Sequence, residues 1–144
     1  MARDWTGWPW RMFSAVGLLA GTLFFAASLT PSLIPRGFVV QGVLSGVAFS
    51  IGYGIGVLGL RLWHYLELPL PEEGRARLVK QAAALACAAV ALVFLWRASG
   101  WQNSIRSLMG MEPVESVRPV QVGLIALAAF VVLFGLARLF RLVW

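Results

Sequence analysis

Residues 38–60 read FVVQGVLSGVAFSIGYGIGVLGL and contain no charged side chain. A transmembrane helix needs about 20 consecutive apolar residues, so this stretch is long enough to cross a bilayer. The hydrocarbon core offers no partner for an unpaired amide, which requires the backbone there to be helical. We therefore expect a transmembrane helix at residues 38–62.

Three further apolar stretches accompany it. Residues 12–30 and 120–137 are uncharged, and residues 81–96 can be extended because Lys80 and Arg97 reach toward the interfaces. The sequence thus predicts four spans, at residues 12–30, 38–62, 78–97 and 119–138. The first stretch also has features of a signal peptide, since Arg3 and Arg11 precede it, although three more spans follow.

The composition points the same way. Apolar residues make up 60% of the chain, charged residues 12%, and the mean hydropathy is +0.81. Soluble domains carry about 25% charged residues, and small ones keep much of their surface exposed. We expect an all-α fold, an integral membrane bundle of four transmembrane helices that forms a single domain over residues 1–144.

The basic residues indicate an orientation. They lie in the short segments between apolar stretches and not on one polar face, which argues against nucleic-acid binding. If the N-terminus is cytoplasmic, eight of the twelve cations fall on the cytoplasmic side, namely Arg3, Arg11, Arg61, Arg75, Arg77, Lys80, Arg138 and Arg141. The excess predicts a multi-pass protein of the inner (plasma) membrane with both termini cytoplasmic.

Two connections carry helix signals. Pro71-Glu72-Glu73 is typical of a helix start, with proline at the first position and acids in the first turn. Residues 101–109 place apolar side chains at helical spacing before Gly110, a typical helix stop. We interpret residues 101–109 as a short helix in the outer interface; a simple connector is the alternative.

Small residues follow one face of the second span. Gly42, Gly46, Ser50 and Gly54 recur every four residues, and the first span carries Gly17 and Gly21. Close backbone approach through small residues favours helix association in lipid. The alanine-rich residues 82–91 of the third span are the expected matching surface. Packing within one chain and homo-oligomerisation both fit the pattern.

The connection between the first two spans reads Thr30-Pro31-Ser32-Leu33-Ile34-Pro35-Arg36. Its two prolines restrict the backbone, which predicts a rigid outer turn. The alternative is a lipid-headgroup notch made by Thr30, Pro31, Ser32, Pro35 and Arg36, in which Arg36 pairs with phosphate.

Catalytic chemistry has few candidates. His64 is the only histidine and Asp4 the only aspartate. A nucleophile elbow has the pattern G-x-S-x-G, and in Gly42-Val43-Leu44-Ser45-Gly46 the serine comes one position later than that pattern requires. We therefore expect no catalytic, cofactor-binding or metal-binding residues, and interpret Cys87 as a small buried side chain. No other ionisable group lies near the centre of a span, which argues against a transporter.

Several motifs resemble a known family. Residues 28–36, Gln41-Gly42-Val43-Leu44-Ser45-Gly46, Gly52-Tyr53-Gly54-Ile55-Gly56, Trp101-Gln102 and Leu108-Met109-Gly110-Met111 are similar to the N-terminal transmembrane region of a bacterial α/β-hydrolase-like membrane protein family. The similarity covers residues 12–144. In that family the region precedes a further span and a separate hydrolase domain that holds the nucleophilic serine, and those catalytic residues have no counterparts here.

The resemblance implies a membrane-anchoring N-terminal domain that is non-catalytic by itself and presents lipid-like substrate. Whether the whole protein is an enzyme stays open, because the hydrolase domain would be separate. The alternative is a small oligomeric transporter or channel subunit. The expected partners are the lipid bilayer, a downstream hydrolase domain and further copies of the chain.

Overall fold

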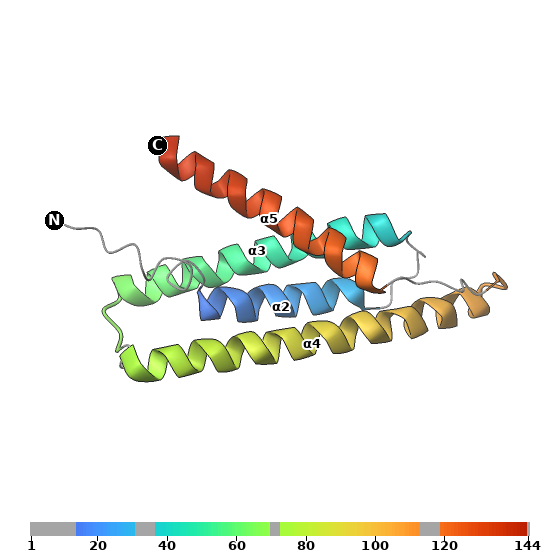
Figure 1. Ribbon diagram of the computed structural model, residues 1–144, viewed down its shortest axis with the longest axis horizontal. Helices are drawn as coiled ribbons and strands as arrows, with labels where there is room; N and C mark the ends of the chain where they lie inside the picture. The colour runs from blue at the N-terminus through green and yellow to red at the C-terminus, as the bar shows by residue number, and fades with distance from the viewer. Residues whose placement is uncertain (1–13, 31–36, 70–72, 113–118, 144) are drawn as a thin grey trace.

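The computed structural model describes residues 14–30, 37–69, 73–112 and 119–143, and these form helices joined by turns, with no strand among them. The helices are α2 (Ala15–Leu29), α3 (Phe38–Tyr65), α4 (Glu73–Leu108) and α5 (Pro119–Val143), shown in Figure 1. The expected all-α fold is confirmed.

Three of the helices, α3, α4 and α5, are long and apolar enough to cross a membrane. At a rise of 1.5 Å per residue they extend for about 42, 54 and 38 Å, more than the hydrocarbon thickness of about 30 Å. The described helix α2 has 15 residues and reaches about 22 Å. The first of the four predicted spans therefore stays a prediction, and its residues 12 and 13 lie outside the described part of the chain.

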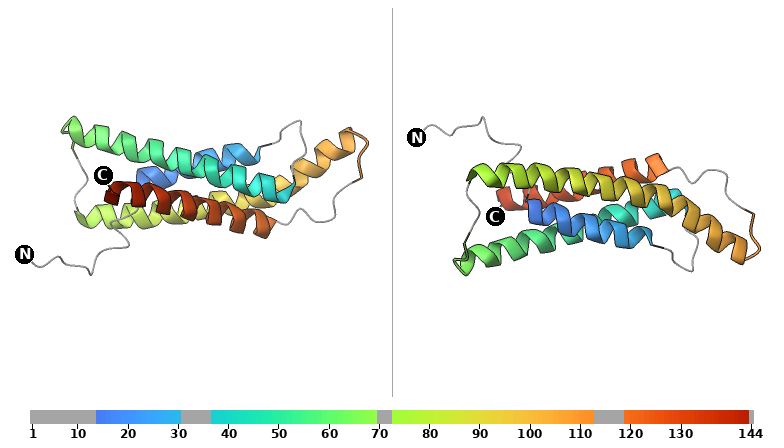
Figure 2. Two further views of the ribbon diagram at one scale, coloured as in Figure 1. Left: turned by 90° about the horizontal axis from the view of Figure 1, so that it is seen from above. Right: turned by 90° about the horizontal axis from the view of Figure 1, so that it is seen from below.

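The separate interfacial helix predicted at residues 101–109 is wrong. Residues up to Leu108 continue α4, which bends in its last part (Figure 2). Unlike proline, Gly100 has a backbone N–H that can donate within the helix, so this residue does not interrupt the helical hydrogen bonds. The Ser104 hydroxyl donates to the Gly100 carbonyl at 2.9 Å, an arrangement that bends helices without ending them.

The predicted stop at Gly110 is confirmed. Gly110 has φ of 69°, a left-handed conformation that glycine adopts without a steric penalty. Its amide donates to the Ser107 carbonyl at 3.2 Å, and the Met111 amide donates to the Arg106 carbonyl at 2.9 Å. These are the two hydrogen bonds of a Schellman motif.

The turn after α3 has the same geometry with a different residue. Glu67 has φ of 53°, and its amide donates to the His64 carbonyl at 3.1 Å. The Leu68 amide reaches the Trp63 carbonyl at 3.3 Å. A glutamate thus occupies a position where glycine would be free of strain.

Helix α3 packs against α2 and α5, and α2 also packs against α4 (Figure 1). No backbone contact joins α3 to α4 within the described residues, because α2 lies between them. The expectation that the alanines of the third span match the small residues of the second is therefore wrong. Of that alanine-rich segment, Ala83 and Cys87 are buried, while Ala82, Ala86, Ala88 and Ala89 are exposed.

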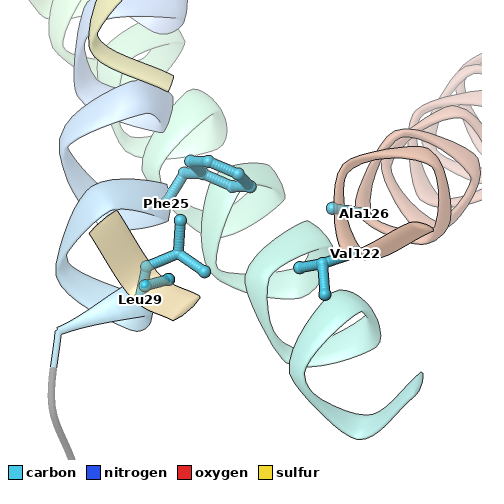
Figure 3. Packing of buried hydrophobic residues seen from close by; sticks show 5 residues of the cluster. Phe25, Leu29, Val122 and Ala126 are labelled. Carbon is cyan, nitrogen blue, oxygen red and sulfur yellow. The ribbon is translucent and has the colours of Figure 1, made fainter. Parts of the chain in front are cut away.

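A small apolar core ties α2, α4 and α5 together. It consists of Phe25, Leu29, Ala98, Val122 and Ala126, and in Figure 3 the α2 side chains point toward those of α5. Many large apolar side chains outside this core are exposed. In the most apolar stretches only 28%, 6% and 11% of the residues of α3, α4 and α5 are buried, so the helices expose apolar surface on most sides.

Candidate functional site

The first half of the small-residue face of α3 lies against α5. A methyl group built on Gly46 would lie 2.5 Å from the Ala126 carbonyl oxygen and 2.7 Å from Ala129 Cβ. One built on Gly42 would lie 2.7 Å from Ile125 Cβ. Real Cβ atoms do not approach other atoms so closely, and only glycine allows this helix spacing.

A second set of glycines lies between α2 and α3. On Gly56 a methyl group would come within 2.6 Å of the Val16 carbonyl oxygen and 2.7 Å of Gly17 Cα. On Gly21 it would lie 3.0 Å from the Phe49 carbonyl oxygen. Gly17 and Gly21 of α2 therefore meet α3 at close range, as Gly42 and Gly46 meet α5.

The other predicted packing residues, Ser50 and Gly54, are not placed like Gly42 and Gly46. No atom lies within 4 Å of a methyl group built on Gly54, and the Ser50 hydroxyl donates to the Gly46 carbonyl of its own helix at 2.8 Å. Both residues line a groove between α3 and α5. One face of α3 is thus a helix contact in its first half and a groove wall in its second.

This groove has a volume of about 650 Å³ and opens where α5 diverges from α3 (Figure 1). Its residues from α3 are Val47, Ser50, Ile51, Tyr53, Gly54, Val57, Leu58 and Arg61, and those from α5 are Phe130, Leu133, Phe134, Ala137 and Arg138. The volume is in the range of small-molecule sites, about 300–1,000 Å³.

Aromatic side chains hold the groove wall in place. The Phe130 ring lies edge-on to Phe49 at 4.8 Å and to Tyr53 at 5.7 Å between ring centres, and Phe134 lies edge-on to Tyr53 at 5.8 Å. Such pairs stabilise by about 0.5–1.5 kcal/mol beyond the burial of their area. The Tyr53 hydroxyl also accepts a hydrogen bond from the Ser14 amide at 3.2 Å, which ties the start of α2 to this wall.

Two arginines stand at one end of the groove. Arg61 belongs to the last turns of α3 and Arg138 to the corresponding part of α5. The Arg138 guanidinium lies 5.8 Å from the centre of the Phe134 ring, a cation–π distance. The groove is therefore apolar along its length and cationic at one end.

A buried polar cluster joins the end of α2 to the start of α3. The hydroxyl oxygens of Ser28 and Ser45 are 2.8 Å apart, and Ser28 donates to the Phe25 carbonyl at 2.7 Å. Gln41 donates from Nε2 to the Ser28 carbonyl at 2.9 Å and to the Ser45 hydroxyl at 3.2 Å. Ser45 is fully buried and Gln41 nearly so. In an apolar bundle such a cluster fixes how two helices meet.

Sequence reasoning did not assign a role to this cluster. Gln41 is the only amide side chain in the apolar stretch of residues 38–60. A polar group inside a span needs a partner in the bundle, and that rule is the signal that could have identified it. The partner itself could not have been named, because Ser28 lies on another helix.

The predicted turn or headgroup motif falls mostly outside the described chain. Thr30 is described; it is exposed, and its hydroxyl donates to the Ala27 carbonyl at 2.6 Å, next to the end of α2. Pro31, Ser32, Pro35 and Arg36 lie outside the described residues. The headgroup notch stays a prediction.

His64 lies at the exposed end of α3, and its Nδ1 is 2.6 Å from the Leu60 carbonyl oxygen one turn earlier. Asp4 is outside the described residues. Among those described, no group of three or more His, Cys, Asp or Glu side chains could hold a metal ion. The described contact of the His64 ring is thus with the backbone of its own helix. Cys87 is buried and belongs to a different helix, α4.

The chain is similar to a known protein family. The model of a family described as "Alpha/beta-hydrolase family N-terminus" matches residues 29–144. No curated protein and no solved structure matches the chain. The matched range includes α3, α4 and α5 and therefore the whole groove.

Proposed function

Because the chain belongs to the alpha/beta-hydrolase N-terminus family, we propose that it is the membrane-anchoring N-terminal domain of an α/β-hydrolase-like protein and is non-catalytic by itself. The observation that carries this proposal is the outward-facing apolar surface of α3, α4 and α5. The hydrolase domain is the proposed partner, and the bilayer is the proposed environment.

The exposed side chains favour lipid over water. Leu85 and Leu92 on α4 and Leu124 on α5 are 74%, 67% and 61% exposed. Removing one such side chain from water is worth about 1.5–3 kcal/mol, and each of the three long helices carries several. A bilayer removes all of them from water at once, without requiring a larger protein core.

Topology can be tested with single cysteines. Glu67 lies between α3 and α4, Glu112 lies between α4 and α5, and both are exposed. In a Cys87→Ala background we expect Glu112→Cys to react with a membrane-impermeant maleimide on intact cells. We expect Glu67→Cys to react only after permeabilisation, since the basic residues place that side in the cytoplasm.

The same experiment supplies its own control. The Cys87→Ala chain without a new cysteine measures background labelling. Equal labelling of both positions on intact cells would show that α4 does not cross the membrane. Labelling of Glu67→Cys alone would leave the anchoring proposal intact but reverse the proposed orientation.

The non-catalytic part of the proposal has a separate test. The purified chain should hydrolyse p-nitrophenyl esters no faster than a buffer containing the same detergent. His64 is the one histidine of the chain, and histidine is the commonest general acid or base in enzymes, so His64→Ala is the informative variant. Turnover by the chain that His64→Ala abolishes would contradict the proposal.

The alternative, a small oligomeric transporter or channel subunit, lacks a polar path in the groove. The Ser50 hydroxyl is bonded to its own helix and the Tyr53 hydroxyl to the Ser14 amide. An ion or polar solute would meet only apolar side chains between these groups. Flux of a solute into liposomes that depends on the chain would favour this alternative over anchoring.

A further inference from the structure

The groove continues the contact between α3 and α5 along both helices. In that contact each glycine of α3 meets two residues of α5, those 80 and 83 positions later in the sequence. Gly46 meets Ala126 and Ala129 in this way, and Gly42 has the same spacing to its α5 neighbours. The two helices therefore pack in a regular register through their first halves.

The same register extends into the groove. For Gly54 it gives Phe134 and Ala137, and these two residues line the groove together with Gly54. A methyl group on Gly46 would lie 2.5 Å from the nearest atom of α5, whereas one on Gly54 would meet no atom within 4 Å. The groove is thus a gap within a helix interface, whose facing walls are in register but stand apart (Figure 1).

The walls of this gap are apolar between its ends. The Ser50 hydroxyl donates to the Gly46 carbonyl at 2.8 Å, and the Tyr53 hydroxyl accepts from the Ser14 amide at 3.2 Å. Apart from these two residues and the arginines at one end, the lining side chains carry no polar group. A polar ligand would lose its hydrogen bonds to water along this length, whereas a hydrocarbon would lose none.

The gap is narrow. Its walls run from Val47 to Arg61 on α3 and from Phe130 to Arg138 on α5, or about 21 and 12 Å at a rise of 1.5 Å per residue. Spread over these lengths, its volume of about 650 Å³ gives a cross-section of about 31–54 Å². A helix about 10–12 Å across has a cross-section of about 80–110 Å². The gap is too narrow to enclose a third helix, but a hydrocarbon chain, one carbon atom wide, can enter it.

We infer that the groove between α3 and α5 binds one acyl chain of a bilayer phospholipid, which lies along Gly54 and against Leu133. The inference rests on the proposed membrane location, because a bilayer supplies such chains along the whole length of both helices. Half of a hydrocarbon core is about 15 Å deep, and this depth falls between the lengths of the two walls. The contact at Gly46 fixes the walls in advance, so binding does not have to order them.

The test follows one lipid on the full chain. The chain is reconstituted into nanodiscs of phosphatidylcholine that carries a diazirine on one acyl chain, then transferred to dodecyl maltoside and washed free of bulk lipid. Native mass spectrometry counts the lipids that remain, and irradiation followed by peptide mapping locates them. Phosphatidylcholine has no net charge, so its retention does not require an anionic headgroup.

We expect one phosphatidylcholine to remain on each chain. Its crosslinks should fall on residues that line the groove, such as Val57 and Leu133. They should be absent from Leu85, Leu92 and Leu124, which are exposed on the helices but do not line the groove.

Filling the gap should displace the lipid. Gly54→Trp places a large side chain on the wall, and Gly59→Trp is the matched control on the same helix. A methyl group on either glycine would meet no atom within 4 Å, and Gly59 does not line the groove. Gly54→Trp should lower the ratio of lipid-bound to lipid-free chain at least about fivefold, a typical effect of overpacking. Gly59→Trp should leave the ratio unchanged. The crosslinks are mapped on the unaltered chain, so that result stands even where a variant fails to fold.

Several results would overturn the inference. They are loss of all lipid from the unaltered chain, crosslinks spread evenly over the exposed leucines, and equal retention by Gly54→Trp and Gly59→Trp. A disulfide between two Gly54→Cys chains in a Cys87→Ala background would make a second copy the occupant instead. Failure of the proposed function is distinguishable, because maleimide labelling would then show that α4 does not cross the membrane.

Discussion

Replacing Gly46 with alanine should loosen the contact between α3 and α5. The added methyl group would lie 2.5 Å from the Ala126 carbonyl oxygen, 2.7 Å from Ala129 Cβ and 3.1 Å from Ala126 Cα. The Ala126 oxygen and Cα are backbone atoms of α5, and Ala129 Cβ is fixed to that backbone, so none of the three can rotate away. The helices would have to separate by almost 1 Å before the closest contact became ordinary.

The size of the effect follows from what that separation removes. A gap of about 0.5–1 Å forfeits about a quarter to a half of the dispersion attraction across a contact. Ala126, which the new methyl group would approach, also belongs to the apolar core with Phe25, Leu29, Ala98 and Val122, so that core would loosen too. Overpacking of this kind costs about 1–3 kcal/mol. In lipid such packing is a main source of helix association, so the loss is not offset elsewhere.

The matched control is Gly54→Ala. It makes the same chemical change on the same face of the same helix, eight residues further along, where the new methyl group would meet no atom within 4 Å. Any gain in helix propensity, about 1 kcal/mol for glycine to alanine, is common to both variants. We therefore expect Gly46→Ala to be about 1–3 kcal/mol less stable than Gly54→Ala.

Unfolding by SDS in mixed micelles, followed by far-UV circular dichroism, measures this difference. Gly46→Leu should be less stable than Gly46→Ala, since leucine places three more carbon atoms than alanine in the same space. If Gly46→Ala and Gly54→Ala unfold at the same SDS fraction, the close contact between α3 and α5 does not contribute to stability, and the packing argument fails.

Two further predictions concern the helix ends and can be measured in the same way. Gln41→Met keeps the side-chain length but removes both donors to Ser28 and Ser45, and it should lower the free energy of unfolding by about 1 kcal/mol, as interhelical hydrogen bonds in membranes are worth about 0.6 each; an unchanged stability would refute a structural role for the cluster. Glu67→Gly should raise the free energy of unfolding by about 0.5–1 kcal/mol, because glycine adopts the left-handed backbone without strain. Gly110→Ala should lower the free energy of unfolding by a similar amount, and changes of the opposite sign would contradict the assignment of these two residues to helix ends.

Much of the secondary structure follows from the sequence. The uncharged stretch at residues 38–60 lies within α3, and the apolar residues from 120 onward lie within α5. The end of α4 was also predictable, because Gly110 supplies the left-handed conformation that closes a helix. What failed was the break before Trp101, since tryptophan and arginine mark a membrane interface without interrupting a helix.

The candidate site was less accessible to sequence reasoning. One periodic pattern includes Gly42, Gly46, Ser50 and Gly54. From the pattern alone, all four residues were predicted to pack against another helix. The structure separates them, because α5 crosses α3 near Gly46 and diverges from it before Gly54. The angle between two helices depends on the side chains of both, so one helix's periodicity does not determine where a contact ends.

The sequence by itself therefore determined the class of the fold, a set of long apolar helices. Hydropathy and charge are properties of each segment by itself, and for that reason they can be judged from the sequence of that segment alone. Only the tertiary structure decided that α5, and not the alanines of α4, meets Gly42 and Gly46, and that Arg61 and Arg138 share one groove. Those relations join residues far apart in the chain, and they exist only once the helices have packed.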